Sequence, residues 1–152
     1  MTATSKTGAQ QPSARTPGLL WLLYLADAGL LVASGLIHLH LWDIAYRHVK
    51  VLDVLFLVQA GAALVAAAVL LATRYLLVVL AAAALMAGTI VGFVLARTTG
   101  IFGFSLTFSS GLANTVLIVE AAAVILLGLT ALALSPRTGW TAQAGSRRDR
   151  RS

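Results

Sequence analysis

Two acidic residues and a histidine stand inside long apolar stretches of this chain, where groups able to do chemistry are rare. Asp27 and His38 fall in the stretch 18–41, and Glu120 falls in the stretch 111–134. An acidic residue at the centre of a membrane-spanning helix costs about 2.5–3.5 kcal/mol, and such residues usually face a bundle interior or a wet cavity. The three are candidates for binding a proton, an ion or a small ligand, or for clamping helices together.

Further polar residues are expected at one common depth. Four residues, one from each apolar stretch, fall roughly 10–14 Å from the outer boundary, counted at about 1.5 Å of helical rise per residue. They are Ser34, Gln59, Thr89 and Glu120. Along the first stretch, Asp27, Ser34 and His38 lie within about 20° of one line on a helix. His38 and Arg97 are the expected partners of Glu120. The predicted intramembrane polar cluster consists of Asp27, Ser34, His38, Gln59, Thr89, Arg97 and Glu120.

The segment IHLHLWDIAYRH, at the end of the first stretch, brings three histidines and an aspartate close together. Imidazole and carboxylate groups are ligands for zinc or copper. His38 and His40 point about 200° apart on an α-helix and cannot chelate one ion together, whereas His40 and Asp43 could. His40 and Asp43 are therefore the candidates for a metal, but interfacial histidines bonded to water or loop carbonyls are favoured. The prediction is that no metal or other cofactor is bound.

Sequence motifs of several common enzyme classes are missing. The chain has no P-loop, no glycine fingerprint for dinucleotides, no nucleophile elbow and no H-E-x-x-H. No catalytic residue is predicted. The net charge of +6 would suit nucleic acid, but Lys and Arg also accumulate beside membrane helices, so no nucleic-acid partner is expected.

Four apolar stretches position the polar residues, over 18–41, 51–73, 75–96 and 111–134. A helix needs roughly 20 apolar residues to cross the hydrocarbon core of a bilayer. Charged residues make up only 11% of the chain, against about 25% in soluble domains. The sequence therefore predicts an all-α polytopic membrane protein, an antiparallel four-helix bundle over 18–134. Small residues such as Gly61, Gly88 and Gly92 are expected to let helices approach closely.

The distribution of basic residues predicts the orientation. Eight of the eleven Lys and Arg residues would lie on the side of the two termini and three on the other side. Because cytoplasmic flanks collect Lys and Arg, both termini are predicted to be cytoplasmic, in a plasma (inner) membrane. Residues 1–17 are expected to be disordered, and 135–152 to form a basic tail. Anionic lipid could bind this tail through Arg147, Arg148, Arg150 and Arg151, at about 1 kcal/mol each.

The connector 98–110 alternates phenylalanines with small polar residues. Such a segment cannot remain extended in hydrocarbon, where its backbone would lack hydrogen-bond partners. We expect it to fold over the outer mouth of the bundle as a lid, with Phe102, Phe104 and Phe108 turned inward.

Short motifs in all four stretches resemble those of a group of small four-helix membrane proteins from high-GC bacteria. The motifs are IHLHLW, VLFLVQA, ARTTGIFGF and LIVEAAAV, and the resemblance covers about 18–134. The group's most recognisable positions match His38, Arg97, Thr98, Gly100 and Glu120. A second histidine at His40 departs from its pattern. The function of the group is not established, so the resemblance implies the architecture and no mechanism.

Two functions remain open at this point. The first is a non-catalytic membrane subunit or accessory protein, which binds lipid and a partner membrane protein or further copies of itself. The alternative is a protein that handles a small molecule, a proton or an ion through an outward-opening polar cavity around His38 and Glu120. Dry packing around these two residues would favour the first function, and a cavity would favour the second.

Overall fold

Four long helices account for nearly all of the structure. The computed structural model describes residues 17–49, 51–98 and 111–135 of the chain. Helix α1 spans Pro17–Leu41 and continues into a short π-helix, η1, over Trp42–Tyr46; α2 spans Leu52–Thr73, α3 Leu76–Thr98 and α4 Gly111–Leu134. Each of the four is long and apolar enough to cross a membrane. The predicted fold class is confirmed, and the protein is a four-span membrane protein.

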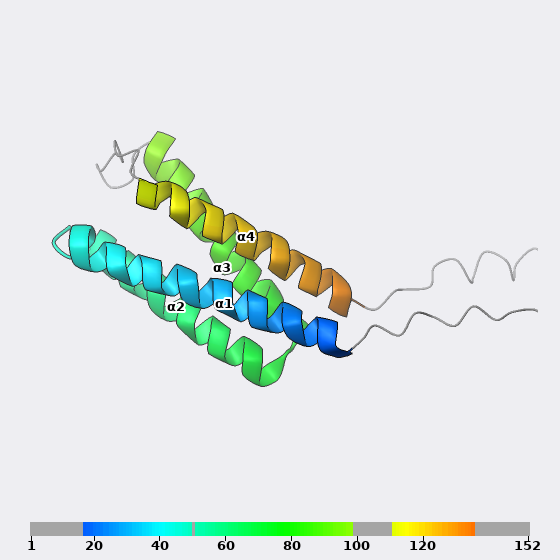
Figure 1. Cartoon of the computed structure of the whole chain (residues 1–152). Coiled ribbons are helices and arrows are strands. Elements are labelled where there is room, and N and C mark those ends of the chain that lie inside the picture. Colours follow the sequence, from blue (N-terminus) through cyan, green and yellow to red (C-terminus); the bar gives the residue numbers. More distant parts are fainter. Residues whose placement is uncertain (1–16, 50, 99–110, 136–152) are drawn as a thin grey trace, which may run out of the picture.

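The helices run antiparallel in chain order around a ring (Figure 1). Helix α1 packs most extensively against α2, and α3 against α4, while contacts from α1 to α4 and from α2 to α3 close the ring. The beginning of α1 and the end of α4 therefore lie at the same end of the bundle, which we call the termini end. Because α4 lies beside α1, the last helix can supply partners to polar groups on the first.

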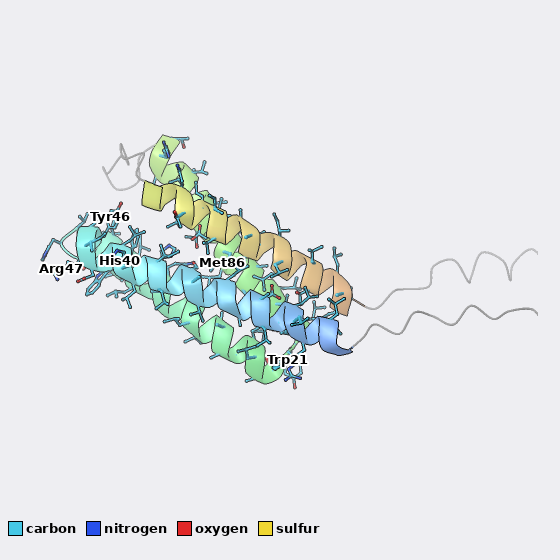
Figure 2. The ribbon with its side chains drawn as sticks, in the orientation of Figure 1. Trp21, His40, Tyr46, Arg47 and Met86 are labelled. Atoms are coloured by element: carbon cyan, nitrogen blue, oxygen red, sulfur yellow. The ribbon has the colours of Figure 1, made fainter. Side chains whose placement is uncertain are left out.

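A tight turn joins α2 to α3 at the termini end. Arg74 adopts the left-handed conformation, with φ 55°, and its N–H donates to the Leu70 carbonyl at 3.0 Å, which closes α2. The Tyr24 hydroxyl donates to the Arg74 carbonyl at 3.0 Å, and the Arg74 guanidinium lies over the Trp21 ring at 4.4 Å. The start of α1 is thus tied to this turn. Figure 2 shows Trp21 at the termini end and Tyr46 and Arg47 at the opposite end, here called the loop end.

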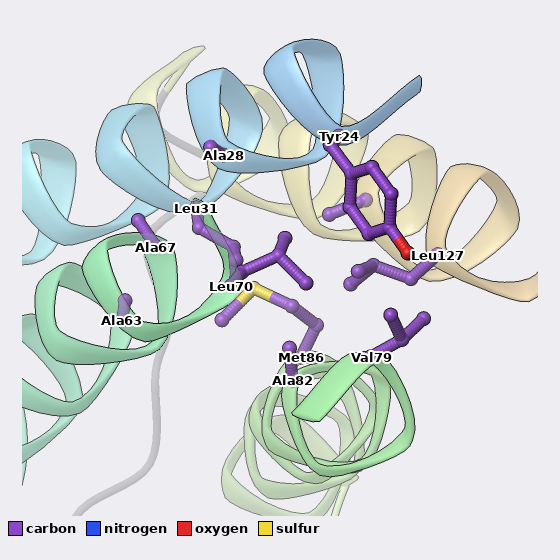
Figure 3. Packing of buried hydrophobic residues seen from close by; sticks show 11 residues of the cluster. Tyr24, Ala28, Leu31, Ala63, Ala67, Leu70, Val79, Ala82, Met86 and Leu127 are labelled. Atoms are coloured by element: carbon purple, nitrogen blue, oxygen red, sulfur yellow. The ribbon is translucent and has the colours of Figure 1, made fainter. Parts of the chain in front are cut away.

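The apolar core fills the half of the bundle nearer the termini end. Leu31, Leu70, Met86 and Leu127, one from each helix, are fully buried there (Figure 3). Large apolar side chains also cover the outer surface, and Leu77 is 77% exposed. An apolar exterior of this kind is expected where the solvent is lipid hydrocarbon.

The close helix contact is made by a glycine that the sequence analysis did not select. A Cβ added to Gly35 of α1 would lie 3.0 Å from Leu64 Cγ and 3.2 Å from the Ala60 carbonyl oxygen of α2. At Gly61, Gly88 and Gly92, by contrast, an added Cβ would meet nothing within 4 Å. The expectation of close approach at these three glycines is wrong within the described residues. Helix α3 turns Val79, Ala82 and Met86 into the core instead.

Candidate functional site

The buried polar side chains among the described residues come from two helices. They are Asp27, Ser34 and His38 of α1 and Glu120 and Thr130 of α4. They form two separate groups, one near each end of the interface between α1 and α4. The single cluster expected from the sequence is therefore divided along the bundle.

At the termini end, the hydroxyl of Thr130 donates a hydrogen bond of 2.7 Å to Oδ2 of Asp27. Both residues are fully buried, and Oδ1 of Asp27 has no hydrogen-bond partner among the described groups. A buried carboxyl bonded by a hydroxyl on another helix fixes the relative position of the two helices, because separation would leave both groups unsatisfied. This contact is a clamp between α1 and α4.

Thr130 was missed by the sequence analysis. In an antiparallel pair, a step toward the N-terminus on one helix matches a step toward the C-terminus on the other. From His38 to Asp27 is eleven residues on α1, and from Glu120 to Thr130 is ten residues on α4. Pairing the first and last spans through His38 and Glu120 would therefore have placed Thr130 beside Asp27. That signal is available only once these two helices are taken as neighbours.

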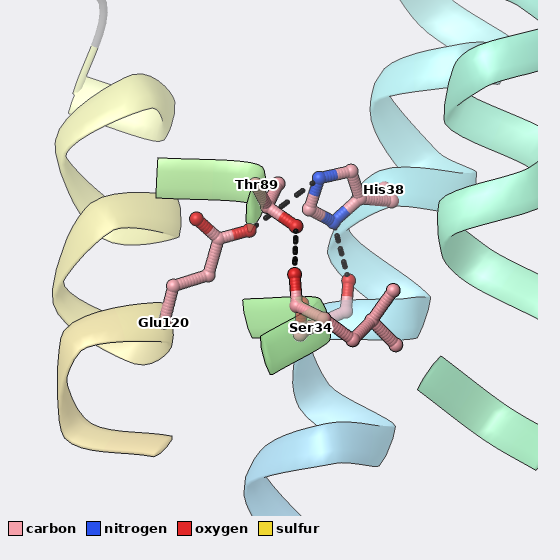
Figure 4. Close-up of polar contacts among 5 residues, drawn as sticks. Ser34, His38, Thr89 and Glu120 are labelled. Carbon is pink, nitrogen blue, oxygen red and sulfur yellow. Dashed lines mark hydrogen bonds and ion pairs between the residues drawn. The ribbon is translucent and has the colours of Figure 1, made fainter. Parts of the chain in front are cut away.

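Nearer the loop end, His38 and Glu120 face each other. Nε2 of His38 lies 3.6 Å from Oε1 of Glu120, and the two side chains are 6% and 0% exposed (Figure 4). Nδ1 of His38 donates to the Ser34 carbonyl at 2.9 Å. Neither carboxyl oxygen of Glu120 makes a hydrogen bond with the described residues, and the Ser34 hydroxyl likewise has no partner there. These buried polar atoms make the pair the strongest candidate site.

An aromatic residue of α2 packs against the imidazole of His38. The Phe56 ring lies 5.5 Å from the His38 ring, and the Tyr46 ring stacks on Phe56 at 4.4 Å. The π-helical segment brings Tyr46 to this position at the end of α1. Sequence analysis did not single out Phe56, since a phenylalanine in an apolar stretch carries no special signal. The Phe56 ring therefore forms part of the apolar surroundings of the imidazole.

The structure places the remaining predicted residues differently. Thr89 is half-buried, and its hydroxyl donates to the Leu85 carbonyl of its own helix at 3.0 Å; Figure 4 shows it in the same close-up as the pair. Gln59 is half-buried, and its Nε2 has no described partner. Arg97 is exposed at the end of α3. Of the two partners expected for Glu120, the structure therefore brings in His38 and leaves Arg97 outside the pair.

The residues considered for metal binding lie on the surface at the loop end. His40 and Asp43 are exposed, and Asp43 accepts from Arg47 at 3.3 Å. Within 17–49, 51–98 and 111–135, no three His, Asp or Glu side chains gather closely enough to hold an ion. The lid residues Phe102, Phe104 and Phe108 and the basic tail lie outside the described residues.

Comparisons of the chain with protein-family models, curated proteins and solved structures find no match.

Proposed function

We propose that this protein is a non-catalytic integral membrane subunit or accessory protein. The observation that carries the proposal is the hydrogen bond between Asp27 and Thr130, which uses a fully buried carboxyl to join the first and last helices. A clamp of this kind preserves one helix arrangement while the apolar exterior is free to contact lipid or partner helices. The helices provide the scaffold, and the outer surface provides the contacts.

Assembly is the property to measure first. The full chain is isolated from its own membrane in nanodiscs, and native mass spectrometry determines what remains bound to it. We expect a fixed stoichiometry, either with a second membrane protein or between copies of this chain. A chain that is monomeric at every concentration and retains lipid alone would contradict a subunit role.

The location and the kinship are part of the same proposal. We place the protein in a plasma membrane with both termini cytoplasmic, because the positive charge of the flanks is unequal. We also propose kinship with the small four-helix proteins of high-GC bacteria, on the short motifs around His38, Arg97 and Glu120. The basic tail would then face the anionic cytoplasmic leaflet.

A second function is favoured by the state of Glu120. Both of its carboxyl oxygens are buried without a hydrogen-bond donor among the described residues, unlike Asp27. A buried carboxyl that only stabilised the fold would be expected to have such a donor. We therefore propose, as the second candidate, that the protein handles a proton or another small cation at His38 and Glu120.

Flux through reconstituted vesicles tests this second function. Liposomes with a trapped pH-sensitive dye are given a pH gradient and a potassium diffusion potential. We expect a proton flux that is lost in Glu120→Gln and retained in Asp43→Asn, an exposed control. Equal flux in protein-containing and protein-free liposomes would remove proton transport as a function.

A further inference from the structure

The hydrogen bond between His38 and Ser34 determines which ring nitrogen carries a proton. A backbone carbonyl oxygen can only accept, so Nδ1 of His38, at 2.9 Å from the Ser34 carbonyl, must be the donor. In a neutral imidazole the other nitrogen, Nε2, then presents a lone pair. That lone pair points toward Oε1 of Glu120, at 3.6 Å.

This arrangement leaves a mismatch between two acceptors. An ionised carboxylate offers only lone pairs, and so does the unprotonated Nε2 atom. Two acceptors that face each other in a buried, low-dielectric space repel each other unless a positive charge lies between them. One proton on either atom would convert the repulsion into an attraction, and a small approach of the two atoms from 3.6 Å would then form a hydrogen bond from the protonated atom to the other.

We propose that His38 and Glu120 form a binding site for one exchangeable proton, shared between Nε2 and Oε1. This proposal deepens the second candidate function, because it names the ligand and the atoms that hold it. On loading, the pair takes a proton from hydronium, one N–H or O–H bond forms, and a water molecule is released. The net charge of the pair changes from −1 to zero. Unloading is the reverse, and no electron is transferred.

The surroundings favour a proton over a metal ion. Zinc requires about four ligands, and calcium about six to eight. Within 17–49, 51–98 and 111–135, the described His, Asp and Glu groups are too few around the pair to supply such a shell. A proton needs only the two atoms that already face each other.

Among the described residues, the groups shown to contact the pair are uncharged. Helix α2 contributes Phe56 against the imidazole, and α1 contributes Ser34. Thr89 of α3 cannot titrate in the accessible range. The other buried acid, Asp27, belongs to the separate Thr130 contact, and Arg97 is exposed. Within the part of the chain that the structure describes, the proton balance of the site therefore depends on His38 and Glu120.

Labelling with dicyclohexylcarbodiimide tests the proposal on the full chain in lipid nanodiscs. This apolar reagent adds to protonated carboxyl groups and adds mass to the peptide that carries them. We expect one adduct per chain, on the peptide containing Glu120, with a labelling rate that falls as the pH rises. Glu120→Gln should abolish the adduct, and Asp43→Asn should leave it unchanged. An adduct on Asp27 alone, or none at acid pH, would overturn the proposal.

Nitrogen NMR of histidine-labelled protein provides a readout that needs no folded Glu120 variant. The His38 signals are assigned as those lost in His38→Gln, while those of His40 and His48 serve as exposed references. We expect Nδ1 of His38 to remain protonated throughout and its Nε2 environment to change in one step with pH. A lone pair on Nδ1, or an Nε2 signal that never changes, would refute the assignment.

Zinc chloride separates the proton site from a metal site. If an equimolar amount of the metal blocks carbodiimide labelling and remains bound in native mass spectra, the pair is a metal site and the proposal fails. If zinc has no effect, the proton assignment is supported. Labelling of Glu120 without proton flux would retain the site and reject the transport function; flux that persists in Glu120→Gln would retain transport and reject the site.

Discussion

Thr130 donates a 2.7 Å hydrogen bond to Asp27, 103 positions earlier in the chain, and so joins α4 to α1 inside the bundle. Both side chains are fully buried, so water cannot replace either partner. The energetic consequence of such a contact is asymmetric. Removal of one partner lowers the free energy of unfolding, because the other is left buried without a hydrogen bond. Replacement of both by apolar groups can leave the free energy of unfolding nearly unchanged.

The first prediction follows from this asymmetry. Thr130→Val should lower the free energy of unfolding by about 1–3 kcal/mol, because the Asp27 carboxyl loses its described donor. The double variant Asp27→Leu/Thr130→Val should recover most of this loss. Reversible unfolding in mixed detergent micelles measures both. Thr115→Val is the matched control, since the exposed Thr115 hydroxyl donates to the Gly111 carbonyl of its own helix. Equal losses in Thr130→Val and Thr115→Val would refute the clamp.

A second prediction concerns the close contact between α1 and α2. Gly35→Leu should destabilise the bundle by about 1–3 kcal/mol, because the new side chain collides with Leu64 and with the Ala60 backbone. Gly88→Leu introduces the same side chain where an added Cβ meets nothing within 4 Å, and should not destabilise. Thermal unfolding of the two variants in nanodiscs provides the comparison. Similar melting temperatures would show that Gly35 is not at a tight contact.

The architecture could be predicted because it follows from the apolar composition of whole segments and not from single residues. Each span repeats the same apolar signal over twenty or more residues, and four such segments with short connectors allow few arrangements. The burial of Asp27, Ser34, His38 and Glu120 followed as well, since lipid excludes unsatisfied polar groups. These inferences need no knowledge of which helix touches which.

The pairing of the polar residues required the helix order. Depth alone grouped Ser34, Gln59, Thr89 and Glu120, but depth does not say which side of a helix faces which neighbour. Contact between α1 and α4 assigns His38 to Glu120 and Thr130 to Asp27. The close contact at Gly35 could not be predicted for the same reason. The sequence does not show which glycine of a span faces a neighbouring helix, and only the packing of α1 on α2 distinguishes Gly35 from Gly88.

The third prediction concerns the orientation in the membrane. The chain contains no cysteine, so a single introduced cysteine is the only thiol that a maleimide can label. His48→Cys, at the loop end, should react with a membrane-impermeant maleimide added to intact cells. Ser135→Cys, at the termini end, should react only after permeabilisation. Both positions are exposed in the structure, so lack of reaction reflects the membrane barrier. The reverse pattern would place the termini outside and contradict the positive-inside assignment.

The last prediction addresses the energetic coupling of His38 and Glu120. Glu120→Ala should lower the free energy of unfolding by a few kcal/mol, because it leaves a cavity and removes the group that faces the imidazole. Glu120→Gln should cost less, because the amide can donate a hydrogen bond to Nε2 and nearly fills the same volume.

A double-mutant cycle isolates the pair from the cavity. Glu120→Leu, His38→Leu and the double variant, whose new side chains cannot hydrogen-bond, are unfolded under the same conditions. We expect a coupling energy of about 0.5–3 kcal/mol, because the residues are in contact across the interface. The coupling should be larger near neutral pH than in strong acid, where an added proton leaves the carboxyl uncharged. A coupling energy below about 0.5 kcal/mol at every pH would show that the two side chains, 3.6 Å apart, do not interact energetically.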